Sequence, residues 1–178
     1  MSSRQTLPRI WLMTDRRIGK ALWDCIERVP ERGGVVLRHH RSDAAFGERV
    51  AQACHARDLM LAVAGDVAYA RRLGAAMVHN PDGDGDGLLT SRAVHDRDEA
   101  AAAQGADLVF VSPVHASASH RGGAAIGLEA ALDLAALAQV PAIALGGMDP
   151  ARGAQAMAAG FYGWAGIDAW LNSERLRS

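Results

Sequence analysis

Six of the seven histidines of this 178-residue chain lie at or shortly after short apolar segments. Imidazole changes its charge near neutral pH, so a histidine in such a position can transfer protons or bind anions. Histidine is also tolerated in any polar loop, which is the structural alternative for each of them individually. The histidines concerned are His39, His40, His79, His95, His115 and His120.

Two glycines and an aspartate follow the last two apolar segments. Gly146 and Gly147 come directly after Ala142–Leu145, and glycine lets a phosphate approach the backbone amides that precede a helix. An ordinary tight turn is the competing interpretation. Asp168 follows Trp164–Ile167, and a carboxylate there repels a phosphate dianion unless it is protonated or turned away.

The sequence contains no strong metal-ligand motif. Neither an HxH nor an HExxH spacing occurs, which gives zinc little support. Asp82, Asp84 and Asp86 alternate with glycine as at the start of a calcium loop. The EF-hand template requires a glutamate at its twelfth position and helices on both sides, and neither is present. We therefore expect a flexible acidic loop here.

Eight short apolar segments are the elements that must position these residues. Most have Val, Ile or Leu on both faces, as expected for parallel strands that are covered on both sides. The expected strands are Ile10–Thr14, Val35–Arg38, Met60–Ala64, Met77–His79, Leu88–Thr90, Leu108–Ser112, Ala142–Leu145 and Trp164–Ile167.

Segments with helical patterning lie between these strands, including Ala44–Arg57, Leu128–Ala138 and Ala151–Ala159. Alternating strands and helices indicate a parallel α/β fold, and eight repeats favour a closed (β/α)8 TIM barrel over an open doubly wound sheet. The chain is short for this fold, and the Gly/Asp run Asn80–Gly87 disfavours a helix. The barrel should therefore be compact, with the fourth crossover helix shortened or missing.

Length and composition predict one domain over residues 1–178, with 171–178 as a frayed polar tail. A net charge of −1 and a pI of about 6.6 argue against a general nucleic-acid binder. The longest apolar stretch is interrupted by charged residues and proline, which excludes a membrane span, and the first residues lack the apolar core of a secretory signal. We expect a cytoplasmic protein in which Cys25 and Cys54 are free thiols.

The chain contains six segments in a particular order, namely Trp11–Arg16, Val36–Arg38, Gly74–His79, Gly105–Val109, Ser112–His115 and Ala144–Met148. In this order and spacing they resemble the thiamine phosphate synthase and thiazole tautomerase superfamily, from about residue 10 to residue 170. The resemblance implies a (β/α)8 barrel, in agreement with the strand pattern.

The resemblance to the synthase also implies a reaction. The synthase joins a pyrimidine pyrophosphate to a thiazole phosphate and releases pyrophosphate with the help of Mg²⁺. This requires a cationic clamp with a metal for the pyrophosphate and a neutral cup for the thiazole phosphate. Arg38 matches an arginine of the family, and His40 stands where the family has a lysine. By the same resemblance Gly146 and Gly147 receive the thiazole phosphate.

The magnesium ligands and the following loop depart from the family pattern. Asp84 corresponds to a metal-binding aspartate of the family, and Asp66 lies one residue beyond the position of another. The resemblance implies four further candidates in the remaining loops. Ser117 and Ser119 keep two hydroxyl groups of the family pattern. His120 replaces a lysine that would contact the pyrophosphate, and Asp168 replaces a serine. Pro113 occupies the position at which the tautomerase branch has its catalytic histidine. His115, two residues later in the same loop, is the candidate to replace that histidine.

These departures fall on reactive groups more than on the scaffold, which indicates a divergent member. We expect a transferase of thiamine biosynthesis that acts on small phosphorylated substrates. One alternative is an isomerase of the tautomerase type that uses His115 or His120 to move a proton. The other is a non-catalytic ligand-binding or regulatory protein on the same scaffold. A homo-oligomer is compatible with the sequence, which does not determine the oligomeric state.

Overall fold

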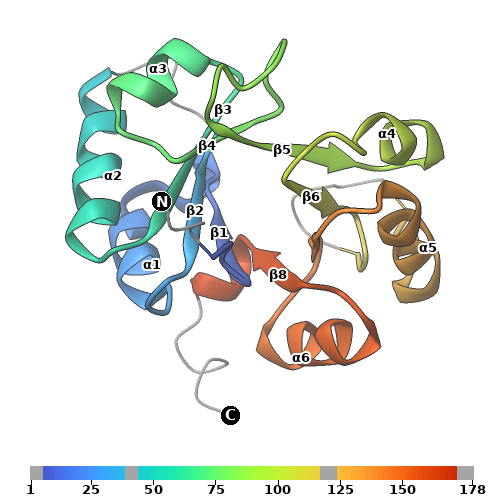
Figure 1. Ribbon diagram of the computed structural model, residues 1–178. Coiled ribbons are helices and arrows are strands. Elements are labelled where there is room, and N and C mark those ends of the chain that lie inside the picture. The colour runs from blue at the N-terminus through green and yellow to red at the C-terminus, as the bar shows by residue number, and fades with distance from the viewer. Residues whose placement is uncertain (1–5, 39–43, 117–123, 172–178) are drawn as a thin grey trace.

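The computed structural model describes residues 6–38, 44–116 and 124–171, in which parallel strands alternate with helices (Figure 1). The strands are β1 (Ile10–Met13), β2 (Gly34–Leu37), β3 (Met60–Ala64), β4 (Met77–His79), β5 (Leu89–Val94), β6 (Leu108–Val111), β7 (Ala142–Ala144) and β8 (Gly163–Gly166). The helices are η1 (Arg16–Ala21), α1 (Leu22–Arg28), α2 (Ala44–Ala56), α3 (Val67–Arg72), α4 (Arg97–Ala102), α5 (Leu128–Ala138), α6 (Pro150–Ala159) and η2 (Asp168–Trp170).

The strands close into one barrel in chain order, because β1 pairs with both β2 and β8. Every pair is parallel, so the carboxyl ends of all strands lie at the same end of the barrel. The helices form the outer layer (Figure 1). The expected (β/α)8 TIM barrel is therefore confirmed, and the loops that follow the strands meet at one mouth.

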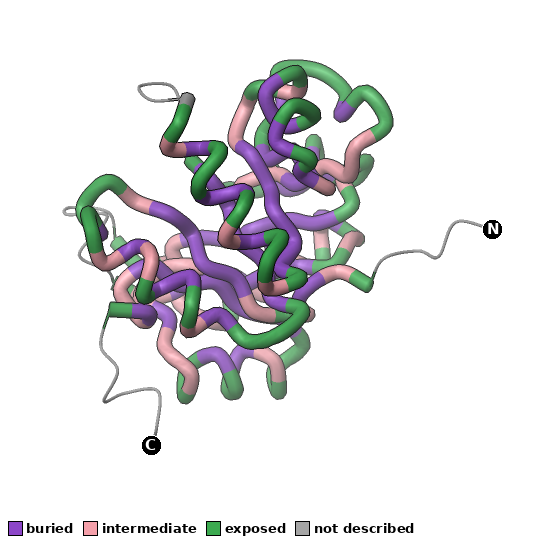
Figure 2. Tube along the Cα trace, turned by 90° about the vertical axis from the view of Figure 1, so that its left-hand side faces the viewer, coloured by how far each residue is buried: buried purple, intermediate pink, exposed green. Residues whose placement is uncertain are grey.

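Strands β2, β6 and β8 are buried on both faces, which explains their near-continuous apolar sequences (Figure 2). The rings of Trp11 and Phe110 meet edge to face inside the barrel, with centroids 5.5 Å apart. The Trp11 indole also fills the space beside Gly34, where an added Cβ would lie 2.2 Å from the ring. A large residue on β1 thus requires glycine at its partner position on β2.

Strand β5 is longer than its apolar residues predict, because it continues through Ser91 and Arg92. Both polar side chains have partners in the fold. The Ser91 hydroxyl lies 3.1 Å from Nδ1 of His79, and the Arg92 guanidinium donates to the carbonyls of Pro81 and Gly83. Tertiary hydrogen bonds therefore extend a strand that apolar patterning alone ends at Thr90.

No helix connects β4 to β5, which confirms the expected loss of the fourth crossover helix. Residues 80–88 form a loop beside α3 (Figure 1). Two arginines hold this loop in place. Arg92 of β5 donates to the Pro81 carbonyl, and Arg71 of α3 forms an ion pair with Asp86 at 2.8 Å. The shortened connection is one reason why the barrel closes with so few residues.

Cys25 and Cys54 are free and buried, as expected from the sequence. Burial raises the pKa of Cys54 to about 12, so this thiol is not a nucleophile at neutral pH. Within the described ranges no helix is both long and apolar enough to cross a membrane. Leu171 is exposed, and the rest of the expected polar tail, 172–178, lies outside the described residues.

Candidate functional site

A cavity of ≈ 590 Å³ opens at the carboxyl ends of the strands. Its walls come from the strands and from the loops after β1, β2, β4, β5, β6, β7 and β8. Apolar side chains such as Met13, Phe110 and Leu145 form part of the lining, and charged groups from the loops after β1, β2, β7 and β8 complete it. This is the end at which barrels of this fold carry their binding sites.

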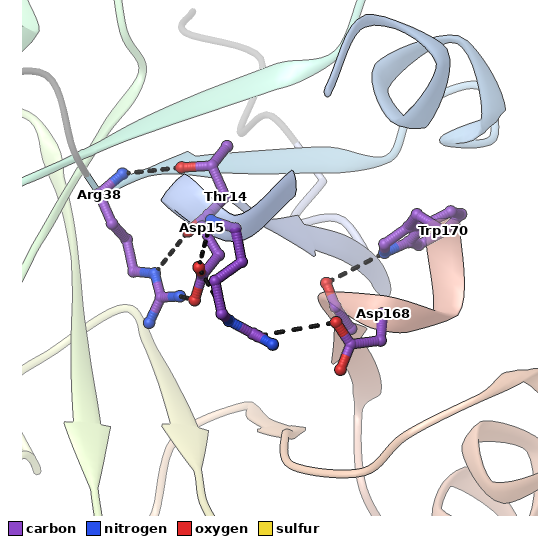
Figure 3. Close-up of polar contacts among 7 residues, drawn as sticks. Thr14, Asp15, Arg38, Asp168 and Trp170 are labelled. Atoms are coloured by element: carbon purple, nitrogen blue, oxygen red, sulfur yellow. Dashed lines mark hydrogen bonds and ion pairs between the residues drawn. The ribbon is translucent and has the colours of Figure 1, made fainter. Parts of the chain in front are cut away.

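Arg38, directly after β2, is the most firmly positioned cation of the cavity (Figure 3). Its backbone N–H donates to Thr14 Oγ1 at 3.0 Å, its Nε donates to Thr14 O at 2.8 Å, and its Nη2 lies 3.3 Å from Asp15 Oδ2. Burial lowers the pKa of Arg38, but a guanidinium remains charged at neutral pH. Among the described residues no contact involves Nη1 of Arg38, so this group can donate to a ligand.

A row of alternating charges links the ends of β2, β1 and β8 (Figure 3). From Arg38 it passes to Asp15, then to Arg17, whose Nε lies 3.1 Å from Asp15 Oδ1 and whose Nη2 lies 3.6 Å from Asp168 Oδ1. Burial alone would raise the pKa of Asp15, but the hydrogen bonds from Arg17 and the two positive charges lower it. The Asp15 carboxylate is therefore ionised, and both Asp15 and Asp168 face arginines.

The position of Asp168 depends on Trp170, which ends the short helix η2 (Figure 3). The Trp170 ring stacks on Trp164 with centroids 5.6 Å apart, and its Nε1 donates to Gly166 O at 3.1 Å. Arg28 of α1 donates to the Trp170 carbonyl at 2.7 Å. These contacts hold η2 against the barrel, so that Asp168 and Ala169 line the cavity.

His79, the last residue of β4, is a buried neutral imidazole in the cavity wall. The side-chain oxygen of Asn80 accepts from the backbone N–H of Ala93, so the amide nitrogen of Asn80 faces His79 Nε2 at 3.4 Å. Because that nitrogen donates, the His79 proton sits on Nδ1 and points to Ser91 Oγ. Burial, together with the charges of Arg38, Arg92 and His95, lowers the pKa of His79 to about 4.

Gly146 and Gly147 line the cavity in the turn between β7 and α6, with φ of +100° and +58°. An added Cβ would lie 2.8 Å from Pro113 Cα at Gly146 and 2.4 Å from Ala116 O at Gly147. Close packing against the β6 loop therefore requires both glycines. Their amide N–H groups have no acceptor among the described residues, so the turn also offers two donors to an anion.

Arg152 and Asp149 lie beside this turn and also line the cavity. Asp149 caps α6 by accepting from the Arg152 backbone N–H at 2.9 Å, and the Arg152 guanidinium donates to the Gly147 carbonyl. His115 lies close to both, and burial and the Arg152 charge lower its pKa. His115 itself does not line the cavity, in contrast to Pro113 and Ala116 of the same loop.

The structure thus brings together Arg38, Gly146, Gly147 and Asp168 among the residues predicted from the sequence. Neither Asp66 nor Asp84 lines the cavity. Asp66 caps α3 by accepting from the Tyr69 N–H, and Asp84 accepts from the Asp86 N–H within the β4–β5 loop. The remaining predicted residues, His40, Ser117, Ser119 and His120, lie outside the described residues.

The described side chains do not fit a magnesium site. In the described ranges no group of three or more His, Cys, Asp or Glu residues is placed to hold a metal ion. The best-placed carboxylates of the mouth, Asp15 and Asp168, already face Arg17. The role of magnesium ligand therefore stays a prediction for Asp66 and Asp84, and we route no chemical step through a metal.

Sequence reasoning named His79 and His95 as strand-end residues without assigning them to the site, and it gave no role to Asn80 or Arg152. All four line the cavity. The signal for Arg152 was available, because Asp149 and Arg152 have the spacing of a helix cap and its first turn after the two glycines. The contact of His79 Nδ1 was not predictable, because its partner Ser91 comes from a different strand.

The eight parallel strands and the cavity at their carboxyl ends define a (β/α)8 barrel that is hollowed at its mouth. The model of the family described as thiamine monophosphate synthase matches residues 12–170, and the chain therefore belongs to this family. No curated protein matches the chain. The resemblance derived from the sequence is thus confirmed at the level of the family.

Solved structures resemble the chain in fold at low sequence identity. The thiamine phosphate pyrophosphorylase of Pyrococcus furiosus is 21% identical with a TM-score of 0.79, and the alignment covers 98% of this chain and 93% of that one. The Bacteroides thetaiotaomicron thiamine phosphate pyrophosphorylase is 18% identical with a TM-score of 0.62, covering 91% and 83%. A 3-hexulose-6-phosphate synthase is 16% identical with a TM-score of 0.65, covering 95% and 98%. At these identities the likeness establishes the fold alone.

Proposed function

We propose that the protein is a transferase of thiamine biosynthesis that joins a pyrimidine pyrophosphate to a thiazole phosphate and releases pyrophosphate. The observation that carries this proposal is that one cavity has two separate ends suited to anions. Arg38 forms the arginine end, and Gly146 and Gly147 form the glycine end. Two phosphorylated substrates that react with each other require two such ends at one mouth.

The arginine end suits the pyrophosphate. Arg38 presents a planar guanidinium whose Nε and Nη2 are occupied by β1, which aims its remaining donors at the cavity. Negative charge increases on the leaving pyrophosphate as its bond to carbon breaks. A fixed cation stabilises that charge without having to reorganise, which is the largest contribution available to an electrostatic catalyst.

The glycine end suits the thiazole phosphate. Backbone amides of a turn with positive φ can converge on one phosphate oxygen, and no side chain obstructs the approach at a glycine. Asp168 lies at this end, but its carboxylate faces Arg17 at 3.6 Å, which offsets part of its repulsion. The anionic residue that the sequence places here is therefore compatible with phosphate binding.

The wall between the two ends is apolar or neutral. Met13, Phe110, Leu145 and the neutral ring of His79 line this part of the cavity. Such a surface can hold two aromatic rings in contact and exclude water from the reacting carbon. Holding both reactants in one orientation contributes to the rate by making the encounter intramolecular.

A specific observation favours a second candidate, a ligand-binding protein without turnover. The arginines that line the cavity each have a carboxylate neighbour, Asp15 for Arg38 and Asp149 for Arg152. With no fitting metal group among the described residues, the charge available to a leaving pyrophosphate is small. Of the two histidines named for the isomerase alternative, His115 does not line the cavity and His120 lies outside the described residues, so no specific observation favours it.

The deciding experiment is an assay of product formation. The purified protein is incubated with both substrates, with Mg²⁺ or with EDTA, and thiamine phosphate is detected after oxidation to its fluorescent derivative. Signal above a no-protein control supports the transferase. If a protein that is folded by circular dichroism gives no product, but either substrate raises its melting temperature, the binding protein is the correct assignment.

A further inference from the structure

Arg152 of α6 lies against the turn that forms the glycine end. Its guanidinium donates to the Gly147 carbonyl, and its backbone N–H donates to the Asp149 carboxylate that caps the helix. The residue also lines the cavity. The fold therefore holds a positive charge in direct contact with the turn, at the mouth of the barrel.

Most of the Arg152 guanidinium is available to a ligand. Its Nε lies 4.0 Å from Asp149 Oδ2, which is the outer limit of an ion pair, and the side chain is half-exposed. Such a pair neutralises little of the charge. Nη2 of Arg152 has no partner among the described residues. The cation of this end is thus less engaged than Arg38 at the other end, which has three hydrogen-bonded or ionic contacts.

The turn adds uncharged donors beside this cation. The N–H groups of Gly146 and Gly147 have no acceptor among the described residues. The free N–H of Gly147 and the carbonyl that Arg152 binds belong to the same residue. An anion on this N–H therefore lies within about 8–10 Å of the guanidinium, the range over which charges attract each other at ordinary ionic strength.

Ser112, which directly follows β6, independently indicates that a polar ligand atom binds in the cavity. The residue lines the cavity and is only 7% exposed, and its hydroxyl has no hydrogen-bond partner among the described residues. Its backbone N–H donates to the Val94 carbonyl, so it continues the β5–β6 ladder. Because side chains alternate along a strand, Ser112 faces the interior of the barrel, as Phe110 does.

This hydroxyl lies close to the glycine end. Pro113, the residue after Ser112, packs against Gly146, where an added Cβ would lie 2.8 Å from the Pro113 Cα. A buried hydroxyl without a partner is unfavourable, and buried polar groups in folded proteins are normally satisfied. A ligand with polar atoms at the glycine end would provide that partner.

We propose that Arg152 determines the specificity of the glycine end, because its charge makes this end prefer a phosphate ester to the corresponding alcohol. The inference rests on the proposed transferase function and deepens it, since it names the residue that distinguishes the thiazole phosphate from the unphosphorylated thiazole. Asp168 lines the same cavity and carries a negative charge that Arg17 offsets in part. Arg152 supplies the positive charge that a phosphate dianion needs and that the two glycines lack.

Calorimetry with two ligands tests this assignment. The full chain is titrated at low salt with the thiazole phosphate and with the thiazole alcohol, in which a hydroxyl replaces the phosphate. The wild-type protein should bind the phosphate about tenfold more tightly than the alcohol, or more. Arg152→Gln should lower the affinity for the phosphate by about tenfold and leave that for the alcohol within about twofold. Arg152→Lys should lose less, because it keeps the charge but not the planar fork.

Arg97→Gln is the matched control. Arg97 also lies in the first turn of a helix capped by aspartate, α4, but it is exposed and does not line the cavity. A phosphate affinity of Arg152→Gln within twofold of this control overturns the proposal. Equal losses for the two ligands also overturn it, since Arg152 would then merely shape the turn. So does a wild-type protein that binds both ligands equally, or neither.

These titrations need no turnover, which separates the inference from the transferase proposal. If the wild-type protein forms no product but prefers the phosphate through Arg152, the transferase proposal fails and the inference holds. If Arg152→Gln forms product with an unchanged kcat/KM for the thiazole phosphate, the transferase proposal holds and the inference fails.

Discussion

Asp15 holds Arg38 in place across two neighbouring strands. The Nη2 of Arg38 lies 3.3 Å from Asp15 Oδ2, while its Nε donates to the carbonyl of Thr14, the residue before Asp15. The two residues after β1 thus hold one edge of the guanidinium of a residue that follows β2. Because Asp15 also faces Arg17, the orientation of the cavity's main cation is set before any ligand binds.

Arg38→Ala should lower thiamine phosphate formation by tenfold or more and weaken the binding of inorganic pyrophosphate. The change removes the fixed cation of the arginine end. Arg38→Lys should give an intermediate loss, because an ammonium keeps the charge but cannot contact Thr14 and Asp15 as a fork does.

The matched control is Arg72→Ala, since Arg72 stacks on Tyr69 in α3 and does not line the cavity. Steady-state kinetics and calorimetry of pyrophosphate binding check both variants. Unchanged kinetics and unchanged affinity in Arg38→Ala would remove Arg38 from the site.

Asp168→Asn should strengthen the binding of inorganic phosphate at the glycine end. One negative charge is removed beside Gly146 and Gly147, which corresponds to roughly threefold in affinity at low ionic strength. The gain should shrink as salt is added, because exposed charges are screened. Isothermal titration at two salt concentrations measures it, with Asp133→Asn on α5 as the control. Equal phosphate affinity in wild type and Asp168→Asn at low salt would contradict a phosphate site here.

Gly147→Ala should destabilise the fold. The backbone has φ +58°, and a Cβ would lie 2.4 Å from the carbonyl oxygen of Ala116, so the β6 loop has to move. Strain of this kind costs about 1–3 kcal/mol. Gly105→Ala is the control, since a Cβ there meets nothing within 4 Å. Urea unfolding compares the two, and a Gly147→Ala midpoint equal to that of Gly105→Ala would show that the loops are not in close contact.

His79 should make the protein less stable in mild acid. Burial and the neighbouring positive charges lower its pKa from 6.5 to about 4 in the folded state, so between these pH values the unfolded chain binds a proton that the native protein does not. Stability therefore falls as pH decreases through this window, by roughly 2 kcal/mol between pH 7 and pH 4.5.

His79→Gln should remove this part of the pH dependence, whereas His55→Gln should keep it. The free energy of unfolding, measured by denaturant titration at the two pH values, gives the difference directly. Equal losses of stability in wild type and His79→Gln would show that the His79 imidazole is protonated in the native protein.

The sequence determined the scaffold. Eight apolar segments, most of them hydrophobic on both faces, favour a parallel barrel covered by helices, and the Gly/Asp run between the fourth and fifth strands disfavours a helix. The order of the short motifs also indicated the family, because these segments contain the turns and strand ends that the fold brings together. Such signals are local, because each depends on residues that are close together in the sequence.

The tertiary structure decided how the polar residues are used. Asp66 and Asp84 accept hydrogen bonds from nearby backbone N–H groups and do not line the cavity, although their sequence positions suggested magnesium. Asp168 was expected to repel a phosphate, but Arg17, which is distant in the sequence, lies 3.6 Å away. His95 and Arg38 share one cavity because the barrel closes. The charge and the partners of a side chain depend on residues from other strands, and only the folded chain brings these together.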